Sequence, residues 1–329
     1  MKILVIGSTG QLGFTIAKKL TQTDHDVVAF HRSSSDITAL QQLPNVVLAQ
    51  GNLLDPDTLG PALKGVDVVI STSNAALPSR KEDHFKNDVI GHKNLIEACK
   101  EAGIKQFIFT SGTDFGSMES RLPLPRSKRQ IEDDLAASGI PYTVFKAAHF
   151  MDIHFAFMGS ELPLNDVVVS SLRRPFKFMN NFYDGVRKNM AEKDTFGVVG
   201  KGDQPFSPIC IDDVAEFHIK AVGNPKAMNR IITIGGPEEL TPLDVKAIFE
   251  EAYGKELKLK STPPFVLNLM SKIFSLSNIN ASNILAMQYA STKISAVVPN
   301  AREVAEEFGI QLTSPRAFIM EKAGMAETV

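Results

Sequence analysis

The chain of 329 residues is long for one compact domain, so we expect one main domain with a smaller appended lobe. Its 35 basic and 37 acidic residues give a net charge of −2, which excludes the positive field that attracts nucleic acid or an anionic membrane. The 2 cysteines form no disulfide framework or metal-binding pattern. With no room for a signal peptide before the first apolar strand, we expect a cytoplasmic monomer or homodimer without a metal, nucleic acid or membrane partner.

The most informative motif stands at the start of the chain. Apolar residues Lys2–Ile6 predict a buried strand, which runs into Gly7-x-x-Gly10-x-x-Gly13 and an amphipathic helix from Gln11. Gly7 permits a tight turn, Gly10 lets the backbone approach a phosphate, and Gly13 lets the helix pack on the strand. The pattern predicts a pyrophosphate site at the helix N-terminus. Its predicted ligands are Gly7, Thr9, Gly10, Gln11, Leu12 and Gly13.

Strands and helices alternate through the first half of the chain. This alternation predicts a Rossmann-type, doubly wound parallel sheet in residues 1–150, with ligands beyond the carboxyl ends of its strands. The predicted strands are Lys2–Ile6, Asp26–His31, Val46–Ala49, Val66–Ser71, Gln106–Thr110 and Pro141–Phe145. The predicted helices are Gln11–Gln22, Asp36–Gln42, Pro56–Leu63, Glu82–Ala102 and Ser127–Ala137.

The end of the second strand selects between the two nicotinamide cofactors. An NAD site places a carboxylate there for the ribose 2′-hydroxyl, but this chain has His31, Arg32 and Ser33, and no carboxylate before Asp36. Arg32 is suited to bind a 2′-phosphate, with help from the serine hydroxyls. We therefore expect NADP(H) in preference to NAD(H). The alternative is that these residues form an ordinary solvated loop.

Two further strand ends offer cofactor contacts. Asn52 is positioned to bond the adenine edge and Leu53 to cover its face, while Asp55 and Pro56 fit the cap and first turn of a following helix. Small polar residues after the fourth strand allow a loop to approach the ribose and pyrophosphate closely, although a plain surface loop has the same composition. These residues are Ser73, Asn74 and Ala75.

Later motifs resemble the short-chain dehydrogenase/reductase superfamily in its extended and atypical branches. The resemblance runs through Phe109-Thr110-Ser111-Gly112 and the segment 123–132, and continues in 140–144 and 212–215. It places Lys128 on the family lysine. The position of the family tyrosine, which exchanges a proton with the carbinol oxygen, is Leu124. Leucine has no proton to give.

Loss of the tyrosine with retention of the lysine resembles the NmrA-like branch, and the segment 234–242 is similar to divinyl-chlorophyllide reductase-like and complex I accessory-subunit-like members. The resemblance implies an NADP(H)-dependent oxidoreductase that transfers hydride to an apolar carbonyl, quinone, ether or conjugated alkene. The same branch contains redox sensors and regulators, so the alternative is a dinucleotide-binding sensor, regulator or assembly factor without turnover. Fold and cofactor follow from the resemblance more directly than substrate does.

Three residues are candidates for chemistry. Lys128 is the leading general acid, because burial and a helix N-terminus both lower the pKa of a lysine. Ser111 is a candidate donor to a substrate carbonyl, and His149 a candidate proton relay near the nicotinamide, which Lys146 and Phe150 are expected to line. The alternatives are a solvated Lys128 in a basic stretch and a structural His149.

The remaining chain, residues 151–329, is expected to form the smaller lobe, with segments near 195–235 returning to the nucleotide domain. Phe and Met side chains crowd the segment 145–183, either to hold a small apolar or aromatic substrate or as the core of the lobe. Short strands are predicted at Phe196–Val199, Ser207–Ile211 and Ile231–Ile234, with helices after Asp212 and Thr241.

Residues 263–298 are predicted to be helical with a break at 275–283. Within them, Phe265, Leu269, Ile273 and Leu276 form one apolar stripe. We expect a core or subunit-contact helix here, because the flanks of a membrane anchor would present a basic face.

Overall fold

The computed structural model describes residues 1–74, 84–173 and 177–325. The chain divides into two compact units. Unit 1 comprises Met1–Asp114, Glu119–Lys146 and Val214–Thr233, and unit 2 comprises Phe115–Met118, Ala147–Asp213 and Ile234–Val329. The chain therefore leaves unit 1 after Lys146 and returns to it for one further segment at Val214.

Unit 1 contains a seven-stranded sheet in the order β3–β2–β1–β4–β5–β6–β8. The strands β3, β2, β1, β4 and β5 are parallel to their neighbours. The strand order reverses between β1 and β4: β2 and β3 follow on one side of β1, and β4, β5 and β6 follow on the other. The loops after β1 and β4 therefore diverge, and in such sheets ligands bind between them, at the carboxyl ends of these strands. The bounds are β1 (Lys2–Ile6), β2 (Asp26–His31), β3 (Val46–Gln50), β4 (Val68–Ser71), β5 (Gln106–Gly112), β6 (Tyr142–Ala147) and β8 (Arg230–Ile234).

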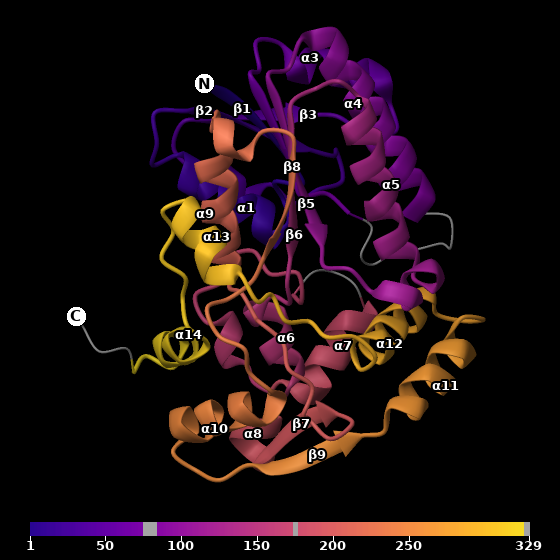
Figure 1. Ribbon diagram of the computed structural model, residues 1–329, viewed down its shortest axis with the longest axis vertical. Coiled ribbons are helices and arrows are strands. Elements are labelled where there is room, and N and C mark those ends of the chain that lie inside the picture. Colours follow the sequence, from indigo (N-terminus) through magenta and orange to yellow (C-terminus); the bar gives the residue numbers. More distant parts are fainter. Residues whose placement is uncertain (75–83, 174–176, 326–329) are drawn as a thin grey trace. The chain divides into compact units, whose positions relative to one another are not determined.

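Helices cover both faces of this sheet, as expected for a doubly wound Rossmann-type fold. Figure 1 shows α1 and α9 along one face, and α4 and α5 along the other. The bounds are α1 (Gln11–Leu20), α2 (Thr38–Gln41), η1 (Pro56–Thr58), α3 (Leu59–Leu63), the π-helical η2 (His84–Ile90), α4 (Gly91–Ala102), η3 (Gly116–Arg121), α5 (Pro123–Ala137), α9 (Ile211–Ala221) and η5 (Pro225–Ala227).

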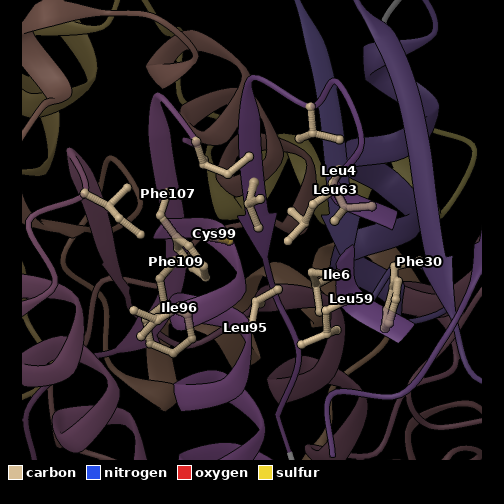
Figure 2. Close-up of a cluster of buried hydrophobic side chains, with 14 of the residues drawn as sticks. Leu4, Ile6, Phe30, Leu59, Leu63, Leu95, Ile96, Cys99, Phe107 and Phe109 are labelled. Atoms are coloured by element: carbon tan, nitrogen blue, oxygen red, sulfur yellow. The ribbon is translucent and has the colours of Figure 1, made fainter. Parts of the chain in front are cut away.

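The core of unit 1 forms where apolar strand residues meet α3 and α4. Leu95, Ile96 and Cys99 of α4 pack against Phe107 and Phe109 of β5 (Figure 2). Burial raises the pKa of the Cys99 thiol to about 12, which makes it an inert core residue. Both cysteines, Cys99 and Cys210, are buried free thiols.

A buried amide fixes the returning segment to the sheet. Gln106 on β5 is fully buried, and its Nε2 donates to Thr143 Oγ1 at 3.0 Å and to the Ala221 carbonyl at 2.9 Å. Its Oε1 accepts a hydrogen bond from the Gly223 amide at 2.9 Å. Both N–H donors of this side chain and one of the two lone pairs of its oxygen are thus in hydrogen bonds. Each of these bonds joins β5 to another segment of unit 1.

Unit 2 has its own core and a parallel pair of strands, β7 and β9. Phe155, Phe196 and Phe249 lie at the centre of this core and are fully buried. The bounds are α6 (Met151–Phe157), η4 (Leu162–Leu164), α7 (Lys177–Val186), α8 (Asn189–Lys193), β7 (Thr195–Val199), α10 (Pro242–Tyr253), β9 (Lys258–Thr262), α11 (Pro264–Phe274), α12 (Ile279–Ser291), α13 (Ala301–Glu307) and α14 (Pro315–Lys322).

Several predicted elements need correction. Ser207–Ile211 is not a strand: Phe206 and Ile209 make isolated bridges on either side of Pro208, which has no N–H for a ladder. The predicted helix Glu82–Ala102 is split in its described part between η2 and α4. Asp55 occupies the predicted cap position, but its side chain makes no cap hydrogen bond.

The helix-start at Thr241 is confirmed in detail. Its hydroxyl accepts from the Asp244 amide, and the Asp244 carboxylate accepts from the Thr241 amide, which completes a capping box on α10. Among the described residues, no helix has the length and apolar character needed to cross a membrane.

Candidate functional site

The glycine loop after β1 accepts no side chain at two of its glycines. Gly7 has a φ of 82°, and a Cβ there would lie 2.7 Å from Thr72 Oγ1. A Cβ on Gly13 would lie 2.2 Å from the Gly7 carbonyl oxygen, so α1 can start this close to β1 only with glycine. The loop after β4 therefore packs directly against the loop after β1, at the point where the strand order reverses.

The N-terminus of α1 is built to receive an anion. The helix begins at Gln11 as predicted; its cap residue, Gly10, has no side chain to bond the first amides, and its first turn holds no acidic residue. The Gly10 amide donates to the Gly7 carbonyl at 2.8 Å, which closes the turn. The positive end of the helix dipole and the first amides therefore meet no side-chain cap and no carboxylate of the first turn, as a pyrophosphate site requires.

The loop after β2 carries a cation, Arg32, and, four residues further along, the carboxylate of Asp36. Arg32 is exposed, and its carbonyl accepts from the Ser35 amide in a turn. Asp36 is engaged elsewhere: its carboxylate accepts from the Thr38 amide at 3.0 Å, and this bond lowers the pKa of Asp36. His31 is buried, with Nδ1 3.1 Å from the Arg32 carbonyl. Ser33 is exposed beside Arg32.

The remaining predicted cofactor contacts are distributed unevenly. Asn52 is exposed, and its Oδ1 accepts from the Leu54 amide at 3.1 Å. Leu53 is 9% exposed and packs in the core, which leaves little of it to cover an adenine. Ser73 is half-buried and its amide lies 2.9 Å from the Cβ position of Gly7. Asn74 is exposed and donates to the Thr72 carbonyl at 3.4 Å, whereas Ala75 lies outside the described residues.

Lys128 lies in the second turn of α5, with its ammonium group at the carboxyl end of β5. Nζ donates to the Thr110 carbonyl at 2.8 Å and lies 5.3 Å from the ring centroid of Phe109. Burial of the ammonium lowers its pKa to about 8, although the carboxylate of Asp88 opposes this shift. An ammonium with this pKa can give up a proton near neutral pH.

Sequence reasoning missed three residues beside Lys128. His92 is fully buried, and its Nδ1 lies 2.8 Å from the Asp88 carbonyl, which accepts and cannot donate. Nδ1 therefore carries the proton, and Nε2 accepts from the Ser71 hydroxyl at 2.9 Å. Burial lowers the pKa of His92, which keeps this imidazole neutral. The four-residue spacing of Asp88 and His92 was the available signal, because it places both on one helical face.

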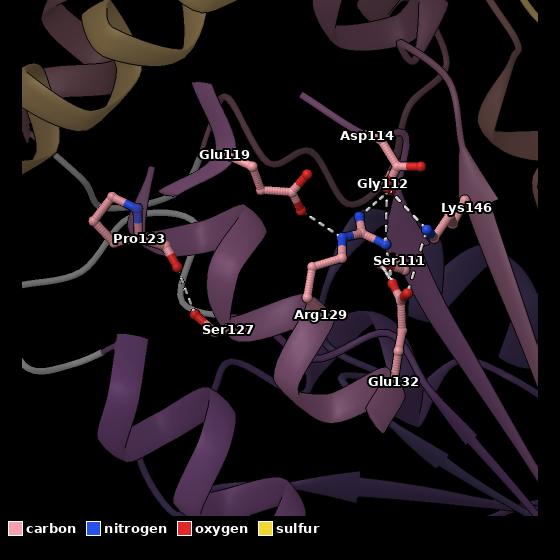
Figure 3. A network of polar contacts seen from close by, with 9 residues as sticks. All are labelled: Ser111, Gly112, Asp114, Glu119, Pro123, Ser127, Arg129, Glu132 and Lys146. Carbon is pink, nitrogen blue, oxygen red and sulfur yellow. Dashed lines mark hydrogen bonds and ion pairs between the residues drawn. The ribbon is translucent and has the colours of Figure 1, made fainter. Parts of the chain in front are cut away.

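Ser111 belongs to a network of charged groups (Figure 3). Its hydroxyl, on a residue 3% exposed, donates to the carboxylate of Glu132, which also accepts from Arg129. Lys146 lies 3.4 Å from the same carboxylate and 2.9 Å from Asp114. Ser111 and Lys146 thus already have partners within unit 1, and a ligand must displace or share them to bind either.

His149 and Phe150 belong to unit 2. The His149 ring lies 4.9 Å from that of His154 and 6.1 Å from that of Phe206. Burial lowers the pKa of His149 to about 4, so it is neutral at pH 7. Phe150 caps α6 and forms a bridge with Ile209. The packing of His149 fits a structural role as well as it fits a relay.

The aromatic segment of unit 2 serves mainly as core in its described part. Phe155, Met151 and Met158 are buried in the core of unit 2. Phe157 and Phe182 pack edge to face with 5.5 Å between centroids. Phe176 and the side chains of Phe178 and Met179 lie outside the described residues. A polar cavity of about 300 Å³ is lined by Glu161, Leu172, Arg173, Asn180, Tyr183, Asp184 and Arg187.

Metal-ligating groups were not expected. Across residues 1–74, 84–173 and 177–325, no three His, Cys, Asp or Glu side chains come together in a group that could hold a metal ion.

The sheet order, the glycine loop at the reversal of that order and the uncapped start of α1 define an α/β protein of the Rossmann-type dinucleotide-binding class. The sequence profile of the NmrA-like family matches residues 1–304. The chain belongs to the NmrA-like family.

Known relatives extend over nearly all of the chain. The photosystem II assembly factor Ycf39 of Synechocystis sp. is 26% identical and covers 98% of this chain and 91% of its own. Isoeugenol synthase 1 of Petunia hybrida is 29% identical, over 89% of this chain and 84% of its own. The NADPH-dependent quinone oxidoreductase of Escherichia coli, solved with NADPH, is 18% identical and superposes with a TM-score of 0.71 over 98% of this chain and 99% of its own. This likeness confirms the fold.

Proposed function

We propose that this protein is an NADP(H)-dependent oxidoreductase that reduces an apolar carbonyl, quinone, ether or conjugated alkene by hydride transfer. The observation that carries the proposal is the position of Lys128, whose ammonium lies at the carboxyl end of β5 with a pKa of about 8. The name of the NADPH-dependent quinone oxidoreductase among the similar structures supports the same reaction class. We assign cofactor binding to unit 1 and substrate binding to unit 2.

The residues present fit a dinucleotide with a 2′-phosphate. The Gly7–Gly13 loop and the start of α1 would hold the pyrophosphate, because no side chain caps the first amides of this helix. Arg32 and Ser33 would hold the 2′-phosphate, because Arg32 is an exposed cation just after β2, whereas the Asp36 carboxylate, which stays charged, accepts from the Thr38 amide. The bound nicotinamide would supply the hydride.

Lys128 would provide the proton or stabilise negative charge on the substrate oxygen. Thr110 fixes the ammonium through its carbonyl, and the ring of Phe109 covers it from one side. Ser71, His92 and the Asp88 carbonyl form a neutral, hydrogen-bonded chain beside it. Burial lowers the pKa of His92 and so keeps its imidazole uncharged, which leaves the cation of Lys128 without a second positive neighbour at that position.

The test is NADPH oxidation, followed by absorbance, with a panel of quinones and enones. We expect turnover with at least one class and a loss of about 10²-fold or more in kcat for Lys128→Met. Arg126→Gln, which removes an exposed cation from the same helix, serves as the matched control. Turnover that is unchanged in Lys128→Met would remove Lys128 from the chemistry.

A second candidate is a dinucleotide-binding regulator or assembly factor without turnover. Leu124 favours it, since this residue of the first turn of α5 stands where the family tyrosine would exchange a proton. The name of the Ycf39 relative, an assembly factor, agrees with this candidate. Tight NADPH binding by calorimetry without oxidation by any substrate of the panel would favour it over the reductase.

A further inference from the structure

Helix α11 presents an apolar stripe to solvent. Phe265 is 68% exposed, Leu269 53%, Ile273 51% and Leu276, just beyond the helix end, 89%. At 100° per residue these four positions fall within an arc of about 80° on one face. Of the two expected roles, core helix and subunit-contact helix, the core role is therefore wrong for this stripe, because its side chains are exposed.

The opposite face of α11 is the one that packs. Leu267 is 6% exposed and Ser271 7%. The Ser271 hydroxyl donates to the Ser282 carbonyl at 2.9 Å, which fixes α11 to α12. Since the packed face is satisfied by a buried leucine and a cross-helix hydrogen bond, the exposed stripe is not needed to hold the two helices together.

The segment around the stripe carries only positive charge. No acidic residue occurs among the 46 residues between Glu256 and Glu303, whereas the 37 acidic residues of the chain would place about five in a stretch of this length. Five basic residues lie within it. They are Lys258, Lys260, Lys272, Lys293 and Arg302.

The lysines of this segment are exposed, so their charge is available to a partner. Lys272 stands next to Ile273 in the helix, on the edge of the stripe, and Lys258 and Lys260 belong to β9, which leads into α11. An apolar face with a lysine at its edge, in a segment that has no carboxylate of its own, has the composition of a helix that lies in a membrane interface. The net charge of the whole chain concealed this local excess.

We propose that this stripe and its flanking lysines bind peripherally to the surface of an anionic phospholipid bilayer. The four apolar side chains enter the interface, and the lysines contact the lipid phosphates. With 11 residues the helix is too short to span a bilayer, so it lies on the surface. A second copy of this chain fits less well, because the segment has no carboxylate to pair with the opposing lysines. The proposal does not depend on the proposed oxidoreductase function, and it revises the expectation of no membrane partner.

The test is co-sedimentation of the full chain with vesicles of phosphatidylcholine alone and with vesicles of equal parts phosphatidylcholine and phosphatidylglycerol. We expect binding to the anionic vesicles that weakens with added salt. The double variants Phe265→Ser with Leu276→Ser, and Lys272→Gln with Lys293→Gln, should each weaken binding about tenfold or more.

Matched controls come from exposed residues elsewhere. Val47→Ser with Val168→Ser removes two apolar side chains that are 60% and 69% exposed, and Lys18→Gln with Lys226→Gln removes two exposed lysines. Both should bind as the parent chain does, and thermal melting verifies that all four variants fold. Absence of sedimentation with anionic vesicles, or equal loss in the controls, would overturn the proposal. Vesicle-free dimerisation that is abolished by the Phe265 and Leu276 variant would overturn it in favour of a second copy.

Discussion

The hydroxyl of Thr110 donates a hydrogen bond to Nε2 of His218 at 2.7 Å, across 108 residues of sequence. The direction is fixed because the other ring nitrogen lies 2.7 Å from the Val214 carbonyl, which only accepts. His218 is fully buried, and burial lowers its pKa to about 4. The neutral imidazole of His218 thus joins α9 to Thr110, near the carboxyl end of β5. The carbonyl of the same threonine accepts the hydrogen bond from Lys128.

Acid should weaken this connection. The folded-state pKa of about 4 lies below the ordinary value of 6.5, so the unfolded chain takes up a proton that the folded chain excludes. The contribution of His218 to the free energy of unfolding is fully present above pH 6.5 and is lost as the pH falls toward 4. We expect this group alone to cost on the order of 2 kcal/mol of unfolding free energy between pH 7 and pH 5.

Urea unfolding of the parent chain and of His218→Gln at both pH values measures the effect. The variant should be less stable at pH 7 and should depend less on pH, by the stated amount. Asp152, whose pKa burial raises to about 6, acts in the opposite direction, so the difference between the two chains is the quantity to compare. Equal slopes for the two chains would show that His218 does not titrate in this way.

The pH profile of turnover should report Lys128. A general acid must be protonated, so kcat for reduction should be constant at low pH and fall as the pH rises through about 8. Lys128→Arg retains the charge but cannot release its proton in this range, so it should lose about 10²-fold or more in kcat. A descending limb at the same pH in a Lys128→Met variant with residual activity would assign that limb to another group.

Cofactor preference should depend on Arg32. Removal of its charge by Arg32→Gln should weaken NADPH binding by about 10- to 100-fold and leave NADH binding within about twofold, because only NADPH carries the 2′-phosphate. Calorimetry with each nucleotide measures both affinities. Arg126→Gln again provides an exposed arginine as control. A parent chain that prefers NADH would contradict the assignment of Arg32.

The glycine loop should fail with a single added methyl group. Gly13→Ala would place Cβ 2.2 Å from the Gly7 carbonyl oxygen, so the loop must shift and the anion site with it. We expect dinucleotide binding below detection and a loss of about 2 kcal/mol or more in stability. Gly185→Ala in α7 is the matched control, since nothing lies within 4 Å of its Cβ position and no proline follows it. It should bind normally and gain about 0.5–1 kcal/mol from helix propensity.

Local sequence signals were sufficient wherever one segment determines its own structure. The bounds of β1, β2 and the start of α1 agree with the prediction, because β-branched runs and glycines act within a few residues. β9 escaped prediction because its residues Lys258–Lys260 are all exposed, so the short leucine–lysine alternation there does not mark a buried face. The stripe of α11 was predicted to belong to a core or subunit-contact helix, because periodicity identifies an apolar face but not what covers it.

In the candidate site, too, the residues within one contiguous motif were predictable, whereas the contacts between distant segments were not. The glycines and Lys128 were predicted from contiguous motifs, and the structure places them at strand ends. The partners of Ser111 were not predictable, since Glu132 reaches it from another element. His92 and Ser71 meet across 21 residues in a hydrogen bond that no spacing rule specifies. Which distant segments pair is decided by the tertiary fold, so the residue pattern along a single segment cannot predict it.

Because Val214–Thr233 belongs to unit 1, the order of synthesis differs from the order of assembly. When the ribosome has released the residues up to Lys146, the amide of Gln106 still has no Ala221 carbonyl or Gly223 amide to bond, and β6 still lacks β8. While residues 147–213 are synthesised, the sheet of the nascent chain therefore has β6 as an unpaired edge strand. A chaperone that protects an unpaired strand during this interval would therefore have its natural target at β6.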